Sequence, residues 1–197
     1  MTGEAAFAPG EVGFGAEISQ DRQLCSIAAG WREPGGRVVA ELRTPQVHPS
    51  LAVARIVQLK ARYRPAAVVI DPKSQAVTLI KPLADAGVGV LEPSARDVAV
   101  AHGEFLDMIA AGDLAHLDQG ELTAAVRAAL QRPLAGAQAW ERKVPVDQSP
   151  LVAATLAVWA LLHRPPQPFF LTSGPERGPV VHQGQVWPVR SPDAYQE

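Results

Sequence analysis

Short runs of apolar residues alternate with polar breaks over the first fifth of the chain. Three of these runs cover residues 14–19, 24–29 and 37–42, and the last contains β-branched Val38 and Val39. Residues 20–22 form a polar break after the first run, and a Glu-Pro-Gly-Gly sequence ends the second. Runs of this length with such breaks are typical of β-strands joined by tight turns. We therefore predict an antiparallel meander of three strands.

The apolar positions change to helical spacing after residue 48. A helix start at residues 48–50 and the spacing that follows predict a helix that ends before Pro65. Residues 66–70 form a continuous apolar run that stops at Asp71, as in a buried parallel strand. Further helices are predicted over residues 74–86, 94–111, 121–130 and 149–163, and another short strand over residues 88–91.

The order of these elements indicates an α/β fold. Three meandering strands, then a helix, a strand, a helix and a strand, describe a mixed sheet of five strands. The RNase H-like fold has this order: a three-strand antiparallel meander plus two parallel strands, flanked by helices. We predict a domain over residues 14–164, a flexible segment before it over 1–13, and a Pro- and Gly-rich tail over 165–197. Phe169, Phe170 and Trp187 would let that tail pack on itself or dock on a partner.

Composition narrows the classes of function. The 197 residues include 18 Lys and Arg against 20 Asp and Glu, and a formal charge of −2 gives no global field for nucleic acid. Any DNA contact must therefore come from local patches. A single cysteine excludes an internal disulfide framework and a multi-cysteine zinc site, and Cys25 falls in an apolar run where it is predicted to be core. No lysine follows a glycine, so the chain lacks the Gly-Lys-Ser/Thr step of a P-loop ATPase.

We expect neither a secretory signal nor a membrane span. The first 13 residues lack a basic region followed by an apolar one. The longest apolar stretch, residues 151–162, is shorter than the ~20 residues that a membrane span needs. That stretch is better interpreted as a buried helix.

Three carboxylates occupy positions where an α/β sheet places catalytic groups. Glu17 lies within an otherwise apolar and small run, where an unpaired carboxylate is costly. Asp71 ends the apolar strand at 66–70, at the carboxyl edge where open sheets place their sites. Asp147 precedes the helix that Pro150 opens. If the first and fourth strands are adjacent, Glu17 and Asp71 become neighbours, and Asp147 is placed to face the same point.

Carboxylates that converge in this way repel one another unless a cation neutralises them. Hard oxygen ligands suit Mg²⁺ or Mn²⁺, and two such ions about 4 Å apart can activate water and stabilise the leaving oxygen in phosphodiester cleavage. Each acid also has a purely structural interpretation. These are a helix cap for Asp147, a turn residue for Asp71 and a half-exposed edge position for Glu17. The combination of the three favours a metal site.

Several stretches resemble the C-terminal nuclease domain of the large terminase subunits of tailed bacteriophages. They are residues 14–22 with the strand at 27–29, the Val-Val-Ile-Asp sequence at 68–71, residues 112–116 followed by 122–126, and Trp140-Glu141-Arg142 followed by 147–157. The last segment is similar to the family's Asp-x-Ser-Pro-Leu-x-Ala-x-x-x-Ala helix start. The resemblance spans residues 13–164, most of the chain.

The resemblance implies an RNase H-like endonuclease domain. Such domains use clustered carboxylates and two divalent cations, Mg²⁺ or Mn²⁺, to cut concatemeric double-stranded viral DNA during genome packaging. The resemblance gives the catalytic and metal-ligand roles to Glu17, Asp71 and Asp147. The chain departs from the family at the first of these, where Asp is usual. Glu is one methylene longer, and a positioning error of about 1 Å can cost ~10²-fold in rate.

The family also implies partners and a place of action. The partners are double-stranded DNA, the ATPase motor domain that precedes the nuclease in the family, the small terminase subunit and the portal. The place is the cytoplasm of an infected bacterial host. Further candidates, for contacts to DNA, are Lys73, His116, Arg127, Arg142 and Lys143, each of which also fits an ordinary structural or solvated role.

Two other functions stay open. The first is a catalytically weak module of the packaging machine that holds DNA or docks on the portal. The second is an RNase H or Holliday-junction resolvase-like nuclease, which keeps the fold and changes the substrate.

Overall fold

The computed structural model describes residues 10–163, 181–182 and 185–186. The chain divides into two compact units, Met1–Pro166 and Gln167–Glu197. Within the second unit, β8 (Val181–His182) and β9 (Gln185–Val186) pair antiparallel.

Some predictions for the two ends of the chain lie outside the described residues. Residues 1–9 and most of the predicted tail, including Phe169, Phe170 and Trp187, are among them. The first strand begins at Val12, inside the segment predicted to precede the domain.

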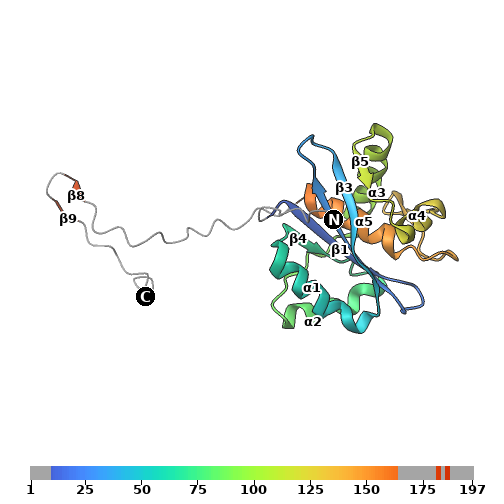
Figure 1. Cartoon of the computed structure of the whole chain (residues 1–197), viewed down its shortest axis with the longest axis horizontal. Coiled ribbons are helices and arrows are strands. Elements are labelled where there is room, and N and C mark those ends of the chain that lie inside the picture. Colours follow the sequence, from blue (N-terminus) through green and yellow to red (C-terminus); the bar gives the residue numbers. More distant parts are fainter. Residues whose placement is uncertain (1–9, 164–180, 183–184, 187–197) are drawn as a thin grey trace, which may run out of the picture. The chain divides into compact units, whose positions relative to one another are not determined.

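The first unit is built on a five-stranded mixed sheet with the strand order β4-β1-β2-β3-β5 (Figure 1). Its strands are β1 (Val12–Ile18), β2 (Cys25–Arg32), β3 (Val38–Val47), β4 (Ala67–Val69) and β5 (Leu114–His116). The first three form the predicted antiparallel meander. β4 adds parallel to β1, and β5 adds parallel to β3. The predicted pattern of three antiparallel strands plus two parallel ones is confirmed.

One predicted strand is wrong. Residues 88–91 make only an isolated parallel bridge, between Val69 and Leu91. The fifth strand is β5, which extends the sheet beyond β3 at the edge opposite β4. Val88 packs into the apolar core with residues of α1. Leu91 makes two backbone hydrogen bonds beside β4: its N–H donates to the Val68 carbonyl at 2.8 Å, and its carbonyl accepts from the Ile70 N–H at 3.2 Å.

The helices follow the predicted order. They are α1 (Pro49–Tyr63), the 3-10 helix η1 (Gln75–Leu79), α2 (Ile80–Asp85), α3 (Ala95–Ala111), α4 (Gly120–Arg127) and α5 (Ser149–Leu162). The single helix predicted over 74–86 is divided into η1 and α2. Pro82 has no N–H to donate to the preceding turn, so an α-helix cannot run unbroken through this point. Ser94 caps α3 as predicted, in a capping box with Asp97.

α5 lies directly on the backbone of the sheet because the strands beneath it carry glycine. Gly13 and Gly15 of β1 face this helix, and a Cβ at Gly15 would come within 2.2 Å of the Ala153 carbonyl oxygen. The helix is rich in apolar residues on all sides and is buried over residues 149–161. A helix of this kind belongs in a core rather than at a surface. α5 is therefore the central helix of the domain.

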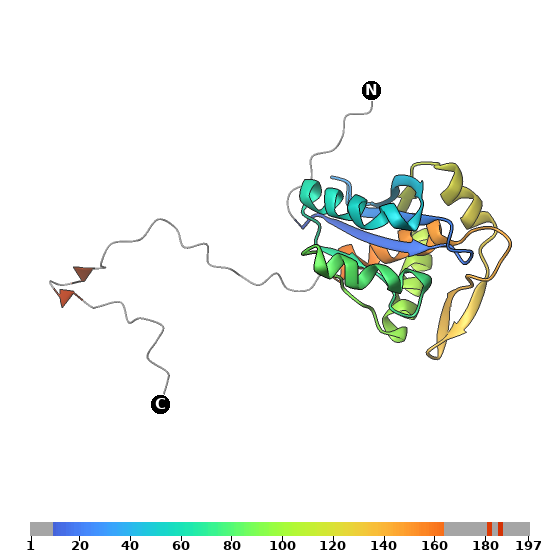
Figure 2. The same ribbon diagram turned by 90° about the horizontal axis from the view of Figure 1, so that it is seen from below.

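α1 packs on the opposite face of the sheet, as Figure 2 shows. Large side chains fill the space there: Phe14 and Ile18 of β1 join Ile56 and Tyr63 of α1 in one apolar cluster. The Phe14 and Tyr63 rings meet edge to face with their centroids 6.1 Å apart. Because strand side chains alternate between faces, the position that follows the two glycines on the α5 face is Glu17.

Candidate active site at the shared ends of β1 and β4

Glu17 lies near the end of β1, on the face that α5 covers. Its partner across the ladder is Ser26, whose hydroxyl oxygen lies 2.9 Å from that of Ser149 at the start of α5. Glu17 is 1% exposed. Its Oε1 accepts a hydrogen bond from the Ile18 N–H at 3.0 Å. The half-exposed position considered from the sequence is therefore wrong, because α5 closes over this end of the strand.

Asp71 follows β4, which pairs in parallel with β1. The carboxyl ends of parallel neighbours meet at the same edge of a sheet, so the topology brings Asp71 beside Glu17. Asp71 is also buried, and its Oδ1 accepts a hydrogen bond from the Lys73 N–H at 2.9 Å. That bond is typical of a turn-forming Asp and engages only one of the two carboxylate oxygens, Oδ1.

Arg142 joins the two carboxylates. Its Nη2 lies 3.1 Å from Glu17 Oε2 and 2.8 Å from Asp71 Oδ2. The arginine follows a hairpin made of β6 (Gln131–Leu134) and β7 (Ala137–Trp140). Its side chain is 12% exposed, so these ion pairs are largely shielded from solvent. We call Glu17, Asp71 and Arg142 the acid–arginine cluster.

Burial governs the charges in this cluster. Burial raises the pKa of Glu17 above its ordinary value of 4.5, and the Arg142 charge opposes that shift. Burial also works against the Arg142 cation, but the two carboxylates together raise its pKa. Within the described part of the chain, Arg142 Nε is buried without a hydrogen-bond partner. With both acids ionised, the cluster carries more negative charge than its one guanidinium neutralises.

Asp147 is held by hydrogen bonds at the start of α5. Its Oδ1 accepts from the Ser149 N–H at 2.9 Å, and its Oδ2 accepts from the Ser149 hydroxyl at 2.8 Å and from Gln46 Nε2. These bonds to the first turn of the helix fit the helix-cap interpretation. No three His, Cys, Asp or Glu side chains are grouped to hold a metal ion in the described residues. The structure thus brings Glu17 and Asp71 together and leaves Asp147 outside their cluster.

The two clustered acids have the donor chemistry of a site for a hard divalent cation. Carboxylate oxygens are the ligands that Mg²⁺ and Mn²⁺ prefer. Glu17 Oε2 and Asp71 Oδ2 already face one cationic group, the Arg142 guanidinium, so this position suits a positive charge. Glu17 and Asp71 therefore fit as ligands of one such ion.

A polar cleft of about 420 Å³ borders the cluster at Arg142. It is lined by Gln20, Lys73, Ser74, Gln75, Arg132, Glu141, Arg142 and Lys143. Four of these residues are cationic and one is acidic, so the cleft favours an anion such as a phosphate. Three of the predicted DNA contacts, Lys73, Arg142 and Lys143, meet in this one place.

The other two predicted DNA contacts lie elsewhere. His116 belongs to β5, at the far edge of the sheet from β4, and its Nδ1 accepts a hydrogen bond from the Asp118 N–H at 3.2 Å. Arg127 ends α4 and is exposed. Neither residue lines the cleft beside the acid–arginine cluster.

Arg132 of β6 also lines the cleft. Its position depends on the β6–β7 hairpin, which the sequence pattern failed to predict. Ala135 and Gly136 form the two-residue turn, both with positive φ, at 50° and 82°. Such turns usually carry Asn-Gly or Asp-Gly, so an Ala-Gly pair is a weak signal.

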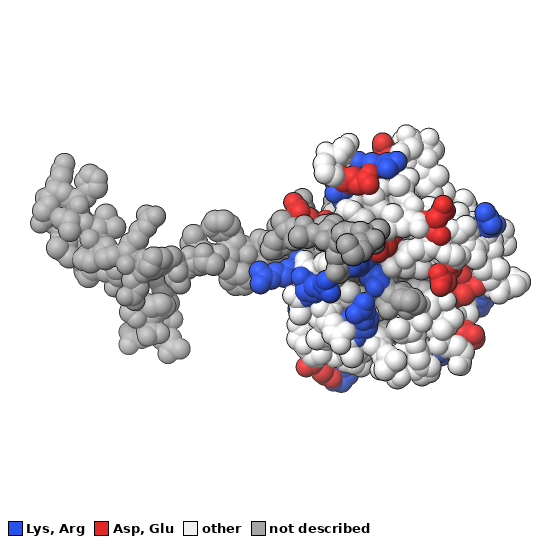
Figure 3. All heavy atoms as spheres, in the orientation of Figure 1, with Lys and Arg blue, Asp and Glu red and all other residues white. Residues whose placement is uncertain are grey.

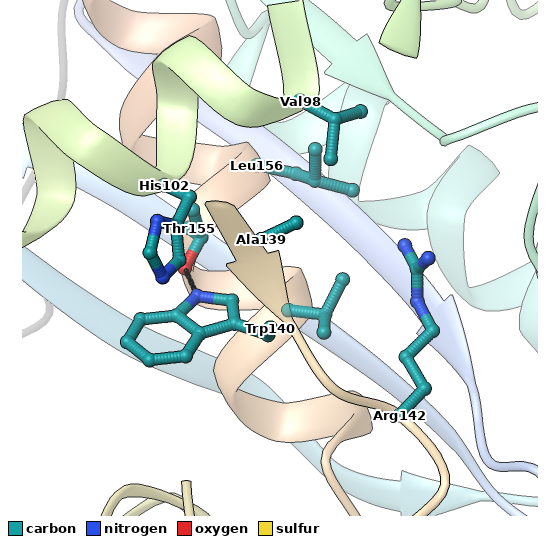
Figure 4. A pocket seen from close by; sticks show the side chains of 8 residues that line it. Val98, His102, Ala139, Trp140, Arg142, Thr155 and Leu156 are labelled. Carbon is teal, nitrogen blue, oxygen red and sulfur yellow. Dashed lines mark hydrogen bonds between the residues drawn. The ribbon is translucent and has the colours of Figure 1, made fainter. Parts of the chain in front are cut away.

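A small buried cavity of about 10 Å³ lies on the inner side of Arg142 (Figure 4). The His102 and Trp140 rings meet there edge to face, with their centroids 4.4 Å apart. Trp140 Nε1 donates to Thr155 Oγ1 at 2.8 Å. Figure 4 shows the Arg142 side chain on the far side from His102. The Trp140 anchor therefore ties the end of β7 to α5, two residues before the arginine that reaches the acids.

Cys25 is fully buried in β2, as predicted. Burial raises the pKa of its thiol to about 12, and the charges of Glu17 and Asp147 add to this effect. A thiol with this pKa stays protonated at neutral pH, so Cys25 is a core residue and not a nucleophile.

The surface carries charge in local groups. On the face in view in Figure 3, Lys and Arg gather near the middle, and Asp and Glu lie mainly around the rim. Local grouping of this kind is what a chain with a net charge of −2 requires if it contacts DNA. Among the described helices, none is both long enough and apolar enough to cross a membrane.

The fold matches solved structures of phage large terminases. The HK97 bacteriophage large terminase gives a TM-score of 0.61 at 16% identity and covers 80% of this chain. The large terminase nuclease of thermophilic phage G20c with bound magnesium gives a TM-score of 0.59 at 15% identity. That match covers 79% of this chain and 84% of the G20c nuclease. The nuclease domain of the SPP1 large terminase, g2p, with bound Mn gives a TM-score of 0.50 at 11% identity. That match covers 75% of this chain and 84% of the SPP1 domain. The RNase H-like class and the resemblance to these nuclease domains are confirmed at the level of the fold.

These matches differ in extent. The chain spans 41% of the HK97 large terminase, against most of the two isolated nuclease domains. No family model and no curated protein matches the sequence. Identities of this size show a shared fold, and the function must be argued from the residues of the site.

Proposed function

We propose that this chain is the nuclease domain of a phage large terminase, a metal-dependent endonuclease that cuts concatemeric double-stranded DNA during genome packaging. One observation carries the proposal. Glu17 and Asp71 pair at the shared end of β1 and β4, beside a cleft lined by Lys73, Arg132 and Lys143. Carboxylates supply ligands for a cation, and basic side chains supply contacts for DNA phosphates.

The residues divide into two roles. Glu17 and Asp71 would hold a divalent ion, Mg²⁺ or Mn²⁺, which when bound activates water and stabilises the leaving oxygen. Lys73, Arg132 and Lys143 would orient the phosphodiester backbone beside that ion. The contact of Glu17 and Asp71 with one guanidinium supports a shared ion at these two acids; the second ion and the catalytic role of Asp147 stay predictions.

The proposed partners are double-stranded DNA, the ATPase motor domain, the small terminase subunit and the portal, in the cytoplasm of an infected bacterial host. Because phosphate contacts dominate non-specific DNA binding, a domain with a net charge of −2 should bind duplex weakly and with marked salt dependence. Stable engagement would then need the motor domain or another partner to hold the DNA.

Cleavage of supercoiled plasmid with Mg²⁺ or Mn²⁺ tests this proposal. We expect the native chain to nick and linearise the plasmid, and Asp71→Asn to reduce the rate by about 10²-fold or more, because it removes a charged metal ligand. Asp107→Asn is the matched control, since Asp107 is exposed on α3. Unchanged cleavage by Asp71→Asn would contradict the role given to this residue.

DNA-binding measurements and cleavage of other substrates separate the alternatives. DNA binding without cleavage, in both metals and with folded protein, would favour the DNA-holding or portal-docking module. Faster cutting of an RNA–DNA hybrid or a four-way junction than of linear duplex would favour the RNase H or resolvase-like reaction.

A further inference from the structure

The Arg142 guanidinium contacts the two carboxylate oxygens that are available to a cation. The remaining oxygen of each acid is already taken by the backbone: Glu17 Oε1 by the Ile18 N–H, and Asp71 Oδ1 by the Lys73 N–H. Glu17 Oε2 and Asp71 Oδ2 both face Arg142 Nη2, at 3.1 and 2.8 Å. A metal ion bound by both acids would therefore need the same two atoms as the arginine.

The cluster needs a cation in this position. Removing one partner of a buried ion pair is strongly destabilising, because it leaves an uncompensated buried charge. Two cations held at the same pair of oxygens would repel each other, and burial strengthens that repulsion because solvent screens it less. The site therefore favours either the guanidinium or the metal ion, not both.

We propose that Arg142 is the resident counter-ion of the acid pair and that a divalent cation must displace it to bind. Arg142 keeps the metal-free domain folded and lowers its apparent affinity for the metal. The cleft gives the displaced side chain a place to go, since Arg142 already forms part of its lining. This inference rests on the proposed function only in taking Glu17 and Asp71 as the metal ligands.

Binding of Mn²⁺ to the full chain tests the competition, with the free ion followed by electron paramagnetic resonance. We expect Arg142→Met to bind Mn²⁺ roughly tenfold more tightly than the native chain, because the competing charge is gone. In EDTA, the same variant should unfold at a temperature about 10 °C lower, and Mn²⁺ should raise its melting temperature more than that of the native chain.

Arg132→Met is the matched control, because Arg132 lines the same cleft without an ion pair to either acid in the described structure. Its Mn²⁺ affinity should stay within about twofold of native, as expected for a single more distant charge. Equal or weaker Mn²⁺ binding by Arg142→Met than by the native chain would overturn the proposal.

If Arg142→Met does not fold in EDTA, Arg142→Lys takes its place. A single ammonium lacks the planar fork that spans both acids, so its Mn²⁺ affinity should exceed that of the native chain, and equality would overturn the proposal. Tighter binding without any DNA cleavage would support the competition and count against the nuclease. DNA cleavage with unchanged Mn²⁺ affinity would support the nuclease and overturn the competition. Absence of Mn²⁺ binding in every variant would overturn both the competition and the metal-dependent nuclease.

Discussion

The two faces of the sheet are packed in different ways, and only one of them carries the candidate site. On the α5 face, Gly13 and Gly15 bring a helix backbone against a strand backbone. On the α1 face, Phe14 and Ile18 separate the helix from the strand by whole side chains. The acid–arginine cluster lies on the first face, at the position where β1 no longer carries glycine.

This difference shows how the fold fixes a charged group. Direct backbone contact leaves little freedom for α5 to shift on β1, whereas interlocked side chains can repack. Functional groups need support from rigid elements if they are to keep a productive geometry. Glu17 gains that support because it lies two residues after Gly15, on the same face of β1 that contacts the backbone of α5.

The largest effect should come from adding one methyl group to the tight face. In Gly15→Ala, the new Cβ would lie 2.2 Å from the Ala153 carbonyl oxygen and 2.6 Å from the Ala157 nitrogen, both backbone atoms. We expect a loss of more than about 4 kcal/mol in the free energy of unfolding, measured by urea denaturation. Gly103→Ala in α3 is the control, because no atom lies within 4 Å of its added Cβ, and it should gain up to about 1 kcal/mol. Similar stability of the two variants would contradict the close backbone packing inferred for the α5 face.

The second effect tests how α5 holds the segment before Arg142. Thr155→Val keeps the side-chain shape but leaves the buried Trp140 Nε1–H without its acceptor. We expect a cost of about 1–3 kcal/mol in the same denaturation measurement. Thr155→Ser retains the hydroxyl and should cost less; a larger loss for Ser than for Val would mean that packing, not the hydrogen bond, secures Trp140.

The third effect probes the α1 face, where packing is by side chains. Ile56→Val removes one methyl group from a fully buried position. We expect a loss of about 0.5–1.5 kcal/mol, because neighbouring side chains can partly close the gap. Calorimetry or urea denaturation of this variant beside Gly15→Ala sharpens the contrast. Removing one methyl group on the α1 face should lower the free energy of unfolding less than adding one methyl group on the α5 face.

The smallest effect is a pH dependence on the α5 side. Burial lowers the pKa of His102 below its ordinary value of 6.5, so the unfolded chain takes up a proton at a higher pH than the folded chain does. Stability should therefore fall as the pH drops below about 6.5, by roughly 1 kcal/mol or less per group. Melting temperatures at pH 7 and 5.5 measure the change. His102→Leu should reduce the change of melting temperature with pH. An unchanged pH dependence in this variant would mean that other groups cause it.

Much of the fold follows from local pattern. The three meander strands were predictable because their breaks are short and polar, and α5 because its apolar run is long and opens at Pro150. The adjacency of Glu17 and Asp71 was also predictable, since a parallel pair of strands places both at one edge. These features depend on residues that are close in sequence or on a topology that the element order already implies.

The features that the sequence did not predict depend on distant partners. Arg142 was predicted as a candidate DNA contact, and nothing near it in sequence indicates that it reaches two buried acids. Asp147 was predicted to face those acids, but Ser149 and Gln46 hold its carboxylate at the start of α5. β5 is only three residues long and has no alternating pattern to mark it. Long-range pairing places Arg142 and β5, whereas Asp147 is held both by the distant Gln46 and by its sequence neighbour Ser149.

The glycine contact also bears on how the domain is made. Gly13 and Gly15 leave the ribosome long before the helix that covers them, which comes from the last part of the described domain. Contacts between segments so far apart in the chain are slow to form. A ribosome that stalls before α5 would leave a sheet with a bare face and an exposed strand backbone, a form prone to aggregate. Completion of this domain therefore waits on its final helix, and chaperone demand should be highest just before that helix leaves the exit tunnel.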